Sequence, residues 1–253
     1  TQIDWATKES SLKAEFNLAV ANPRATYNDG VGTVQRDNND SLKFEMPSHQ
    51  WFDVTDKDGS YGVSVLDDCK YGSDKPADNM VRLTLLYTPG VRYSYSEQAV
   101  QDFGRHKMLF ALYGHAGDWR EASSNLQGMR LNQPLMSFQT LSHKGILGRA
   151  FSFLSINNSD VVLSAMKKAE SGDDLIVRIV ETKGREAKNV ELAFASPVVS
   201  AREVNGQEQD VSATVVRNGK LVFDAAPYHL RTFAVRLQPS KARLSLPQSA
   251  PIG

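Results

Sequence analysis

The chain has 253 residues, and its 29 Lys and Arg residues are balanced by 29 Asp and Glu residues, so its formal net charge is +0. This balance excludes the strong positive charge with which proteins bind nucleic acid or anionic membrane surfaces. No apolar run approaches the ~20 residues of a bilayer-spanning helix. We therefore expect a soluble protein with no nucleic-acid or membrane partner, and a core large enough for one large domain or two ordinary ones.

Alternation of apolar and polar residues is the main pattern along the chain. A period of two is that of half-buried strands, because successive side chains point to opposite faces of a sheet. Turn residues between the runs favour hairpins. The sequence therefore predicts an all-β protein in which paired sheets pack face to face. The expected strands are residues 12–18, 42–46, 81–86, 107–112, 190–194 and 232–237, with turns at 56–60, 205–207 and 218–220.

One segment, residues 118–129, departs from this period. Ala122, Leu126 and Met129 recur at helical spacing, and Asp118 stands three residues before Glu121 as in a capping box. We expect a short helix here with Asp118 as its cap. A functional carboxylate at Asp118 is the alternative.

A domain boundary is expected near residues 150–160, where glycines and polar residues lead into an apolar hairpin at 161–181. The expected organisation is a first β region at 1–155, a smaller β-sandwich at 156–238 and a linker or tail at 239–253. Because the chain opens without Met and ends in KARLSLPQSAPIG, we expect a piece of a longer polypeptide.

The single cysteine, Cys69, lies between an acidic pair and a lysine, in Asp67-Asp68-Cys69-Lys70. A reactive thiol needs an electropositive surrounding that lowers its pKa, and here the two carboxylates oppose the one lysine. We therefore predict a buried or half-buried structural thiol rather than a nucleophile.

His106 and His115 are the obvious pair of metal-ligand candidates. They lie nine residues apart along what is expected to be one strand. An odd separation puts them on opposite faces, so they cannot bind the same ion unless a β-bulge interrupts the strand. We expect no metal site in this chain.

Several longer motifs carry a resemblance to a known family. FEMPSHQWFDVTDKDGSYGVSVLDDCKYGSD is followed in order by RLTLLYTPG, DFGRHKMLFALYGHAGDW, LNQPL and VVLSAMKKAESGDDLIVRIVE. This series resembles the C-terminal β region of glycoside hydrolase family 38 α-mannosidases, in the branch with bacterial and cytosolic or vacuolar enzymes. The resemblance implies that residues 1–155 form part of a galactose-mutarotase-like supersandwich and that residues 156–238 form the small β-sandwich that follows it.

The resemblance also implies what the parent enzyme does. Such an enzyme would be a zinc-dependent retaining α-mannosidase that hydrolyses terminal α-mannosides in glycans. Its zinc and catalytic carboxylates would belong to an N-terminal α/β domain followed by a helical bundle, which would be the partners of this chain. No residue here matches those motifs, so the resemblance gives this chain no catalytic residue, no metal and no cofactor of its own.

Two groups of residues are singled out by the resemblance. One is a motif at the end of a core strand, expected to be structural first and interdomain second, in which Gly72 would permit an unusual backbone conformation. The other lies at a sheet edge, where Arg105 would donate hydrogen bonds toward the sugar or the catalytic domain. Asp102 would orient that arginine and Gly104 would permit the turn. The alternative is a solvated Arg105 and a His106 paired with Asp102. The first group is Asp67, Asp68, Cys69, Lys70, Tyr71 and Gly72, with His115 and Asp118; the second is Asp102, Gly104, Arg105 and His106.

Two further functions stay open at this point. A stand-alone carbohydrate-binding module could use Trp51, Trp119, Tyr93 and Tyr95 as stacking faces, although Trp51 sits in an alternating run where aromatics usually belong to the core. A purely structural interaction module needs no ligand at all. The compartment is unknown, with a bacterial periplasm favoured over a cytoplasm.

Overall fold

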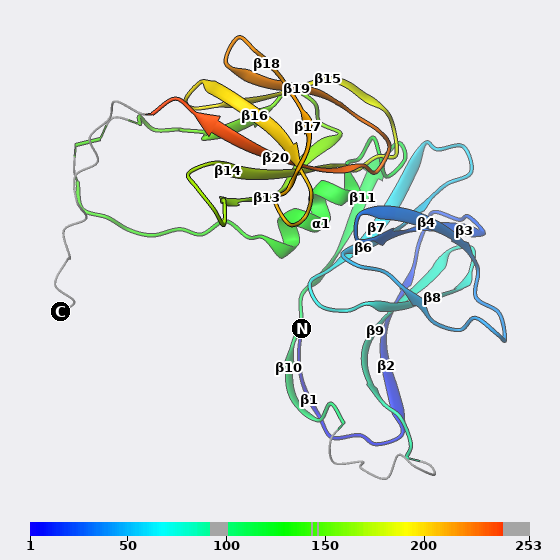
Figure 1. Cartoon of the computed structure of the whole chain (residues 1–253). Coiled ribbons are helices and arrows are strands. Elements are labelled where there is room, and N and C mark those ends of the chain that lie inside the picture. The colour runs from blue at the N-terminus through cyan, green and yellow to red at the C-terminus, as the bar shows by residue number, and fades with distance from the viewer. Residues whose placement is uncertain (92–100, 143, 146, 240–253) are drawn as a thin grey trace. The chain divides into compact units, whose positions relative to one another are not determined.

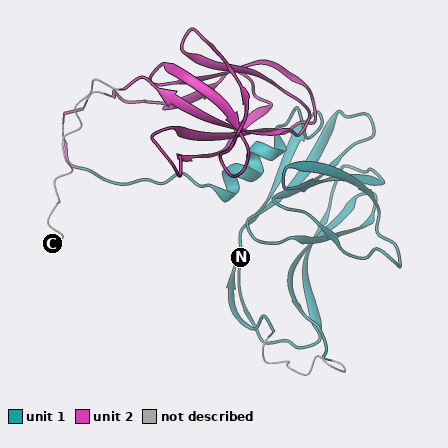
Figure 2. Ribbon diagram, viewed as in Figure 1, with its two compact units in different colours: residues 1–140 teal, residues 141–253 magenta. Residues whose placement is uncertain are grey.

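The computed structural model describes residues 1–91, 101–142, 144–145 and 147–239. The chain divides into two compact units, residues 1–140 and 141–253 (Figure 2). Apart from one helix, the regular elements of the described residues are strands (Figure 1), which confirms the all-β prediction. The expected boundary at 155/156 stays a prediction. Tyr93, Tyr95 and residues 240–253 of the expected tail lie outside the described residues.

The described part of unit 1 contains three antiparallel sheets. A two-stranded sheet pairs β1 (Gln2–Trp5) with β10 (Gly104–Lys107). A five-stranded sheet has the order β11 (Phe110–Ala116), β7 (Tyr61–Asp67), β6 (Trp51–Thr55), β3 (Arg24–Asp29) and β4 (Gly32–Asp37). A four-stranded sheet has the order β2 (Ser10–Asn17), β9 (Met80–Thr88), β8 (Gly72–Ala77) and β5 (Met46–Pro47).

The main core of unit 1 lies between its two larger sheets. Val81 and Leu83 of β9 belong to the same buried cluster as Tyr27 of β3 and Phe52 and Val54 of β6. The rings of Tyr27 and Phe52 stack with centroids 5.6 Å apart. The predicted sandwich therefore forms, and the alternation in β9 and β2 provides one of its inner faces.

The opposite face of the five-stranded sheet is also buried. Trp51, Leu66 and Trp119 form a second apolar cluster beside helix α1 (Ser124–Asn132), with the two indole rings 5.1 Å apart. The prediction that Trp51 belongs to the core is confirmed, since it is fully buried. Trp119 is buried too, and the Arg120 guanidinium lies 4.2 Å from its ring centroid, so it is no free stacking face for a sugar.

The predicted helix starts later than expected. Asp118 accepts hydrogen bonds from the backbone N–H groups of Arg120 and Glu121, but these belong to a turn that precedes α1. Ser123 adopts a left-handed conformation at φ 56° and separates the turn from the helix. Asp118 therefore caps a turn, and the prediction that it caps the helix was wrong because the N-cap position belongs to Ser123.

Two of the predicted strands also differ from those in the structure. Residues 42–45 form no strand, and Leu42 and Phe44 are exposed, so their alternation does not reflect a buried face. The expected strand at 107–112 is divided, because β10 ends at Lys107 and β11 begins at Phe110. His106 and His115 consequently lie on different strands, and the argument from opposite faces of one strand was wrong.

Within its described residues, unit 2 is a sandwich of two antiparallel sheets. Val177 and Phe233 from one sheet pack with Leu192 and Phe223 from the other, and the two phenyl rings lie 4.8 Å apart. The predicted hairpin at 161–181 is confirmed as β13 and β14. The first sheet has the order β13 (Val161–Lys168), β14 (Leu175–Glu181), β20 (Leu230–Leu237), β16 (Val198–Val204), β17 (Asp210–Ala213); the second has the order β12 (Leu154–Ile156), β15 (Ala187–Phe194), β19 (Lys220–Ala225), β18 (Val215–Arg217).

Candidate functional site

The motif at residues 67–72 lies where β7 ends and the chain turns toward β8. Asp67 is fully buried and its Oδ1 accepts the backbone N–H of Lys70 at 2.9 Å. Its Oδ2 has no hydrogen-bond partner. Asn132 at the end of α1 donates its side-chain N–H to the carbonyl oxygen of Asp67 at 2.9 Å. Through these two hydrogen bonds, Asp67 links the following turn and the end of α1 to β7.

Burial is the main influence on the Asp67 carboxyl group. Desolvation and the nearby Asp68 charge raise its pKa to about 7, against the lowering effect of the Lys70 N–H and charge. A buried carboxyl group with one oxygen unpartnered is more stable when protonated.

Cys69 lies at the surface in this turn, so the prediction of a buried thiol was wrong. Turn residues after a strand leave the sheet, and their side chains need not pack in the core. Partial desolvation of the sulfur, with the adjacent Asp68, raises the pKa of the Cys69 thiol to about 11. Because the thiolate is the nucleophile, this thiol is poorly reactive at neutral pH.

Gly72 has no left-handed backbone, and the prediction of an unusual conformation there was wrong. A Cβ atom at this position would instead lie 2.5 Å from Oε1 of Glu45. Tyr71 is exposed and stacks on His49, with ring centroids 6.0 Å apart. The end of the motif therefore depends on close side-chain approach rather than on backbone strain.

The second predicted group lies on the two-stranded sheet. Arg105 of β10 is directly opposite Asp4 of β1, and its Nε donates to Asp4 Oδ1 at 2.9 Å. Both side chains are exposed, at 78% and 73%. Asp102 instead contacts His106, whose Nε2 lies 3.1 Å from the Asp102 carbonyl oxygen and 3.7 Å from its carboxylate. Asp102 therefore does not orient Arg105 as expected; Asp4 does, from a strand about a hundred residues earlier.

Gly104 has a φ of 109°, and this agrees with the expectation that it permits a turn at the start of β10. The Arg105 guanidinium, held by one carboxylate and otherwise exposed, keeps donors available for another acceptor.

His115 lies in a buried polar cluster on the α1 side of the five-stranded sheet. Its Nε2 is 2.7 Å from Asp53 Oδ2, and Asp53 also accepts hydrogen bonds from Ser64 at 2.7 Å and Thr55 at 2.6 Å. Ser64 in turn lies 2.7 Å from the hydroxyl of Ser124 at the start of α1. The side chains of His115 and Asp53 are 2% and 1% exposed.

This cluster has the residue types of a catalytic triad but another geometry. In a triad the serine and the aspartate bind different imidazole nitrogens. Here both lie near Nε2, while His115 Nδ1 is 3.2 Å from the Gly117 carbonyl oxygen, and Ser64 donates to Asp53. The arrangement is a structural network that joins β6, β7 and β11 to α1.

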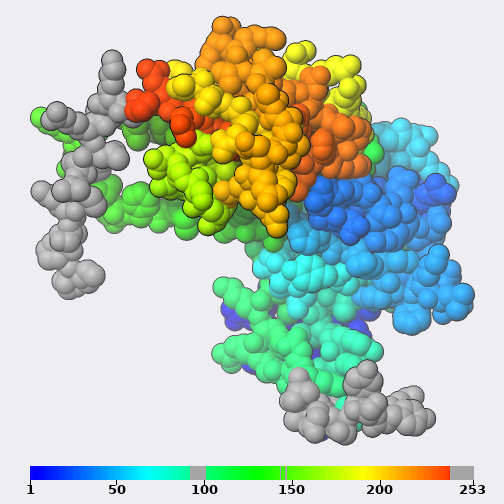
Figure 3. Space-filling view, viewed as in Figure 1, coloured from blue at the N-terminus to red at the C-terminus, as the bar shows by residue number. Residues whose placement is uncertain are grey.

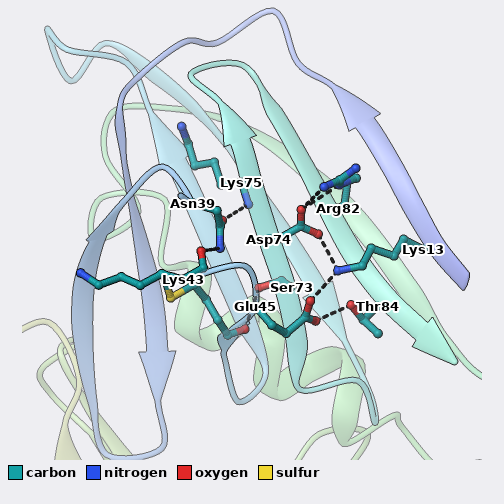
Figure 4. Close-up of polar contacts among 10 residues, drawn as sticks. Lys13, Asn39, Lys43, Glu45, Ser73, Asp74, Lys75, Arg82 and Thr84 are labelled. Atoms are coloured by element: carbon teal, nitrogen blue, oxygen red, sulfur yellow. Dashed lines mark hydrogen bonds and ion pairs between the residues drawn. The ribbon is translucent and has the colours of Figure 1, made fainter. Parts of the chain in front are cut away.

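A third polar cluster, on the four-stranded sheet, was not predicted from the sequence. Asp74 of β8 is 2% exposed and accepts hydrogen bonds from Lys13 of β2 at 2.7 Å and Arg82 of β9 at 2.8 Å (Figure 4). Lys13 also pairs with Glu45, which accepts the Thr84 hydroxyl. Both Asp74 oxygens are occupied, so this carboxylate is not free for chemistry. The sequence carries no signal for this cluster, because its residues are far apart along the chain and come together only through strand pairing.

Among the described residues, no group of three or more His, Cys, Asp and Glu side chains converges as a metal site would require. No helix among them is long and apolar enough to span a bilayer.

Two family models match the chain. "Glycosyl hydrolases family 38 C-terminal domain" matches residues 1–91, and "Glycosyl hydrolases family 38 C-terminal beta sandwich domain" matches residues 160–233. The first match lies in unit 1 and the second in unit 2. The chain belongs to the C-terminal β region of glycosyl hydrolase family 38.

Two proteins that are similar to this chain in sequence are α-mannosidases. The chain is 28% identical over 249 residues to Alpha-mannosidase 2C1 of Homo sapiens, and 26% identical over 244 residues to Alpha-mannosidase G of Dictyostelium discoideum. These alignments cover 94% and 92% of this chain but only 23% and 21% of the relatives. A crystal structure of an alpha-mannosidase from Enterococcus faecalis V583 has the same fold at a TM-score of 0.75, with 18% identity, over 93% of this chain and 27% of that one.

We predict that Asp67→Asn stabilises the protein at pH 8. The folded-state pKa of about 7 exceeds the ordinary 3.8, so the native state holds a proton that the unfolded state has lost. The contribution of this residue is therefore favourable at low pH and is lost as the pH rises from about 4 to about 7. Asp67→Asn should raise the free energy of unfolding at pH 8 by about 1–3 kcal/mol and change it little at pH 4, measured by urea denaturation. Asp58→Asn, at an exposed position in the turn between β6 and β7, is the control. A destabilised Asp67→Asn variant at pH 8 would contradict this.

We also predict a pH dependence at His115. Burial opposes its protonation, but the hydrogen bond and charge of Asp53 outweigh burial and raise the pKa above 6.5. The stabilisation is complete below the unfolded pKa and is lost as the pH rises through the raised folded value. His115→Gln should therefore flatten the decrease in Tm of the wild-type protein above pH 6.5, whereas His229→Gln, at an exposed position, should not. Identical slopes for both variants would disprove the assignment.

Proposed function

We propose that this chain is the C-terminal β region of a zinc-dependent retaining α-mannosidase acting on terminal α-mannosides in glycans, and that it supports a catalytic domain without performing the reaction. The observation that carries the proposal is the pair of family 38 matches on a chain that spans 23% of the human α-mannosidase it resembles. The remaining three quarters leave room for the expected N-terminal α/β domain and helical bundle. The bacterial periplasm stays a prediction for the compartment.

Three buried carboxylates of unit 1 support a non-catalytic role. A retaining glycosidase needs two carboxyl groups about 5–5.5 Å apart and accessible to the sugar. Asp53 and Asp74 are buried and occupied by neighbouring donors, and Asp67 is buried in a turn. We therefore assign hydrolysis and zinc binding to the part of the enzyme outside this chain.

We expect the purified chain not to hydrolyse an α-mannoside. The test measures nitrophenol release from a nitrophenyl α-mannoside with and without added zinc, beside the full polypeptide as the positive control. Zinc-dependent turnover by the 253-residue chain, or stoichiometric zinc bound to it, would disprove this division of roles. Calorimetry with mannose on the same chain tests the alternative of a stand-alone carbohydrate-binding module, which predicts saturable binding.

Within this function, we infer that Arg105 faces the sugar or a carboxylate of the catalytic domain. Its support is the exposed guanidinium on the two-stranded sheet, which pairs with Asp4 and has further N–H donors. A planar and permanently charged group can grip two acceptors at once.

Arg105→Ala in the full polypeptide should lower kcat/KM by roughly ten- to a hundredfold, the scale of one lost charged hydrogen bond. Arg24→Ala provides a matched control, because Arg24 makes an equally exposed cross-strand pair with Asp37 at 3.0 Å. Zinc content and Tm should change little in either variant, since exposed ion pairs contribute little to stability. Equal kinetics for the two variants would leave Arg105 a surface residue.

A further inference from the structure

The chain that follows α1 is apolar and exposed. Residues 134–140 form no regular element, and Figure 1 shows them in green as an extended trace after the helix. Leu135, Met136 and Phe138 are exposed to 101%, 94% and 89%, as much as in an unfolded chain. We call these three residues the apolar segment; the space-filling view shows the green residues after α1 at the surface (Figure 3).

Single exposed apolar side chains are common, but this segment has three within four positions. No charged residue occurs from Leu131 to Ser142, although charged residues make up 23% of the chain. A solvated loop usually carries polar and charged residues, and this one instead presents a Leu, a Met and a Phe to water. Such a surface is typical of a contact with another protein part.

We propose that the apolar segment docks into an apolar groove of the catalytic part of the same polypeptide, which deepens the proposed function and rests on it. The relatives are about four times as long as the region they share with this chain, so a large partner surface lies on the same polypeptide. A tethered partner has an effective concentration far above that of a second copy in dilute solution. The segment lies outside both family-model matches, which end at residue 91 and resume at residue 160.

The chemistry of the segment fits an extended anchor. Pro134 restricts the backbone at its start, which reduces the entropy lost on docking. Phe138 offers a large rigid apolar surface, and Met136 adapts its shape to an irregular groove. The occupied groove should therefore be lined by apolar side chains and closed to water around Met136.

Oxidation of Met136 reports directly on this contact. Both the 253-residue chain and the full polypeptide are treated with hydrogen peroxide, and the oxidation rate of each methionine is followed by mass spectrometry. Met136 should oxidise at least tenfold more slowly in the full polypeptide. Met166 on β13, which is 41% exposed, is the internal control and should oxidise at a similar rate in both. An equal rate for Met136 in both proteins would overturn the proposal.

A variant tests the anchor itself. Phe138→Ser in the full polypeptide should restore at least threefold faster oxidation of Met136, whereas Val211→Ser, at an exposed position of unit 2, should leave it unchanged. Protection of Met136 in the 253-residue chain that increases with concentration would assign the segment to a second copy and overturn the proposal.

The activity of the same full-length sample separates this inference from the proposed function. An active α-mannosidase with exposed Met136 would overturn the docking contact and leave the function standing. Protected Met136 in a polypeptide without α-mannosidase activity would overturn the function and retain the contact.

Discussion

The five-stranded sheet of unit 1 is buried on both faces, and the arrangement of the polar residues in that unit depends on this constraint. Phe52 and Val54 face the four-stranded sheet, while Trp51 and Leu66 face α1 and Trp119. Side chains alternate along each strand, so Asp53 and Ser64 lie on the same covered face as Trp51 and Leu66. A carboxylate buried there must be satisfied locally, and His115, Ser64 and Thr55 do so. The close approach of His115 also requires Gly62, where an added Cβ would lie 2.6 Å from the imidazole.

Two more buried polar groups of unit 1 are satisfied by partners within its sheets and loops. Asp74 joins three neighbouring strands through Lys13 and Arg82. Lys75, next to it, is buried among backbone and amide oxygens, and desolvation lowers its pKa to about 8 against the opposing charge of Asp78. Arg105, by contrast, is an exposed group on the two-stranded sheet.

Local sequence patterns predicted the strands with one buried face and the core position of Trp51, because the period of two records burial directly. The same pattern failed at 42–46, where Leu42 and Phe44 are exposed and only Met46 is buried, and at 118–129, where a left-handed Ser123 delays the helix. The contacts of the candidate site residues could not be predicted from the sequence, for another reason. Arg105 meets Asp4 and His115 meets Asp53 through strand pairing between distant segments, and a single sequence does not state its register. Cys69 was misplaced because burial of the strand before it does not extend to the turn.

The most direct test of a supporting role is to remove the region and return it. A polypeptide that lacks residues 1–253 but keeps the catalytic part should lose α-mannosidase activity and melt at a lower temperature, and addition of the separately purified 253-residue chain should restore both. Restoration should fail with the chain carrying Phe138→Ser and succeed with the one carrying Val211→Ser. A shortened polypeptide with unchanged activity and Tm would contradict the supporting role.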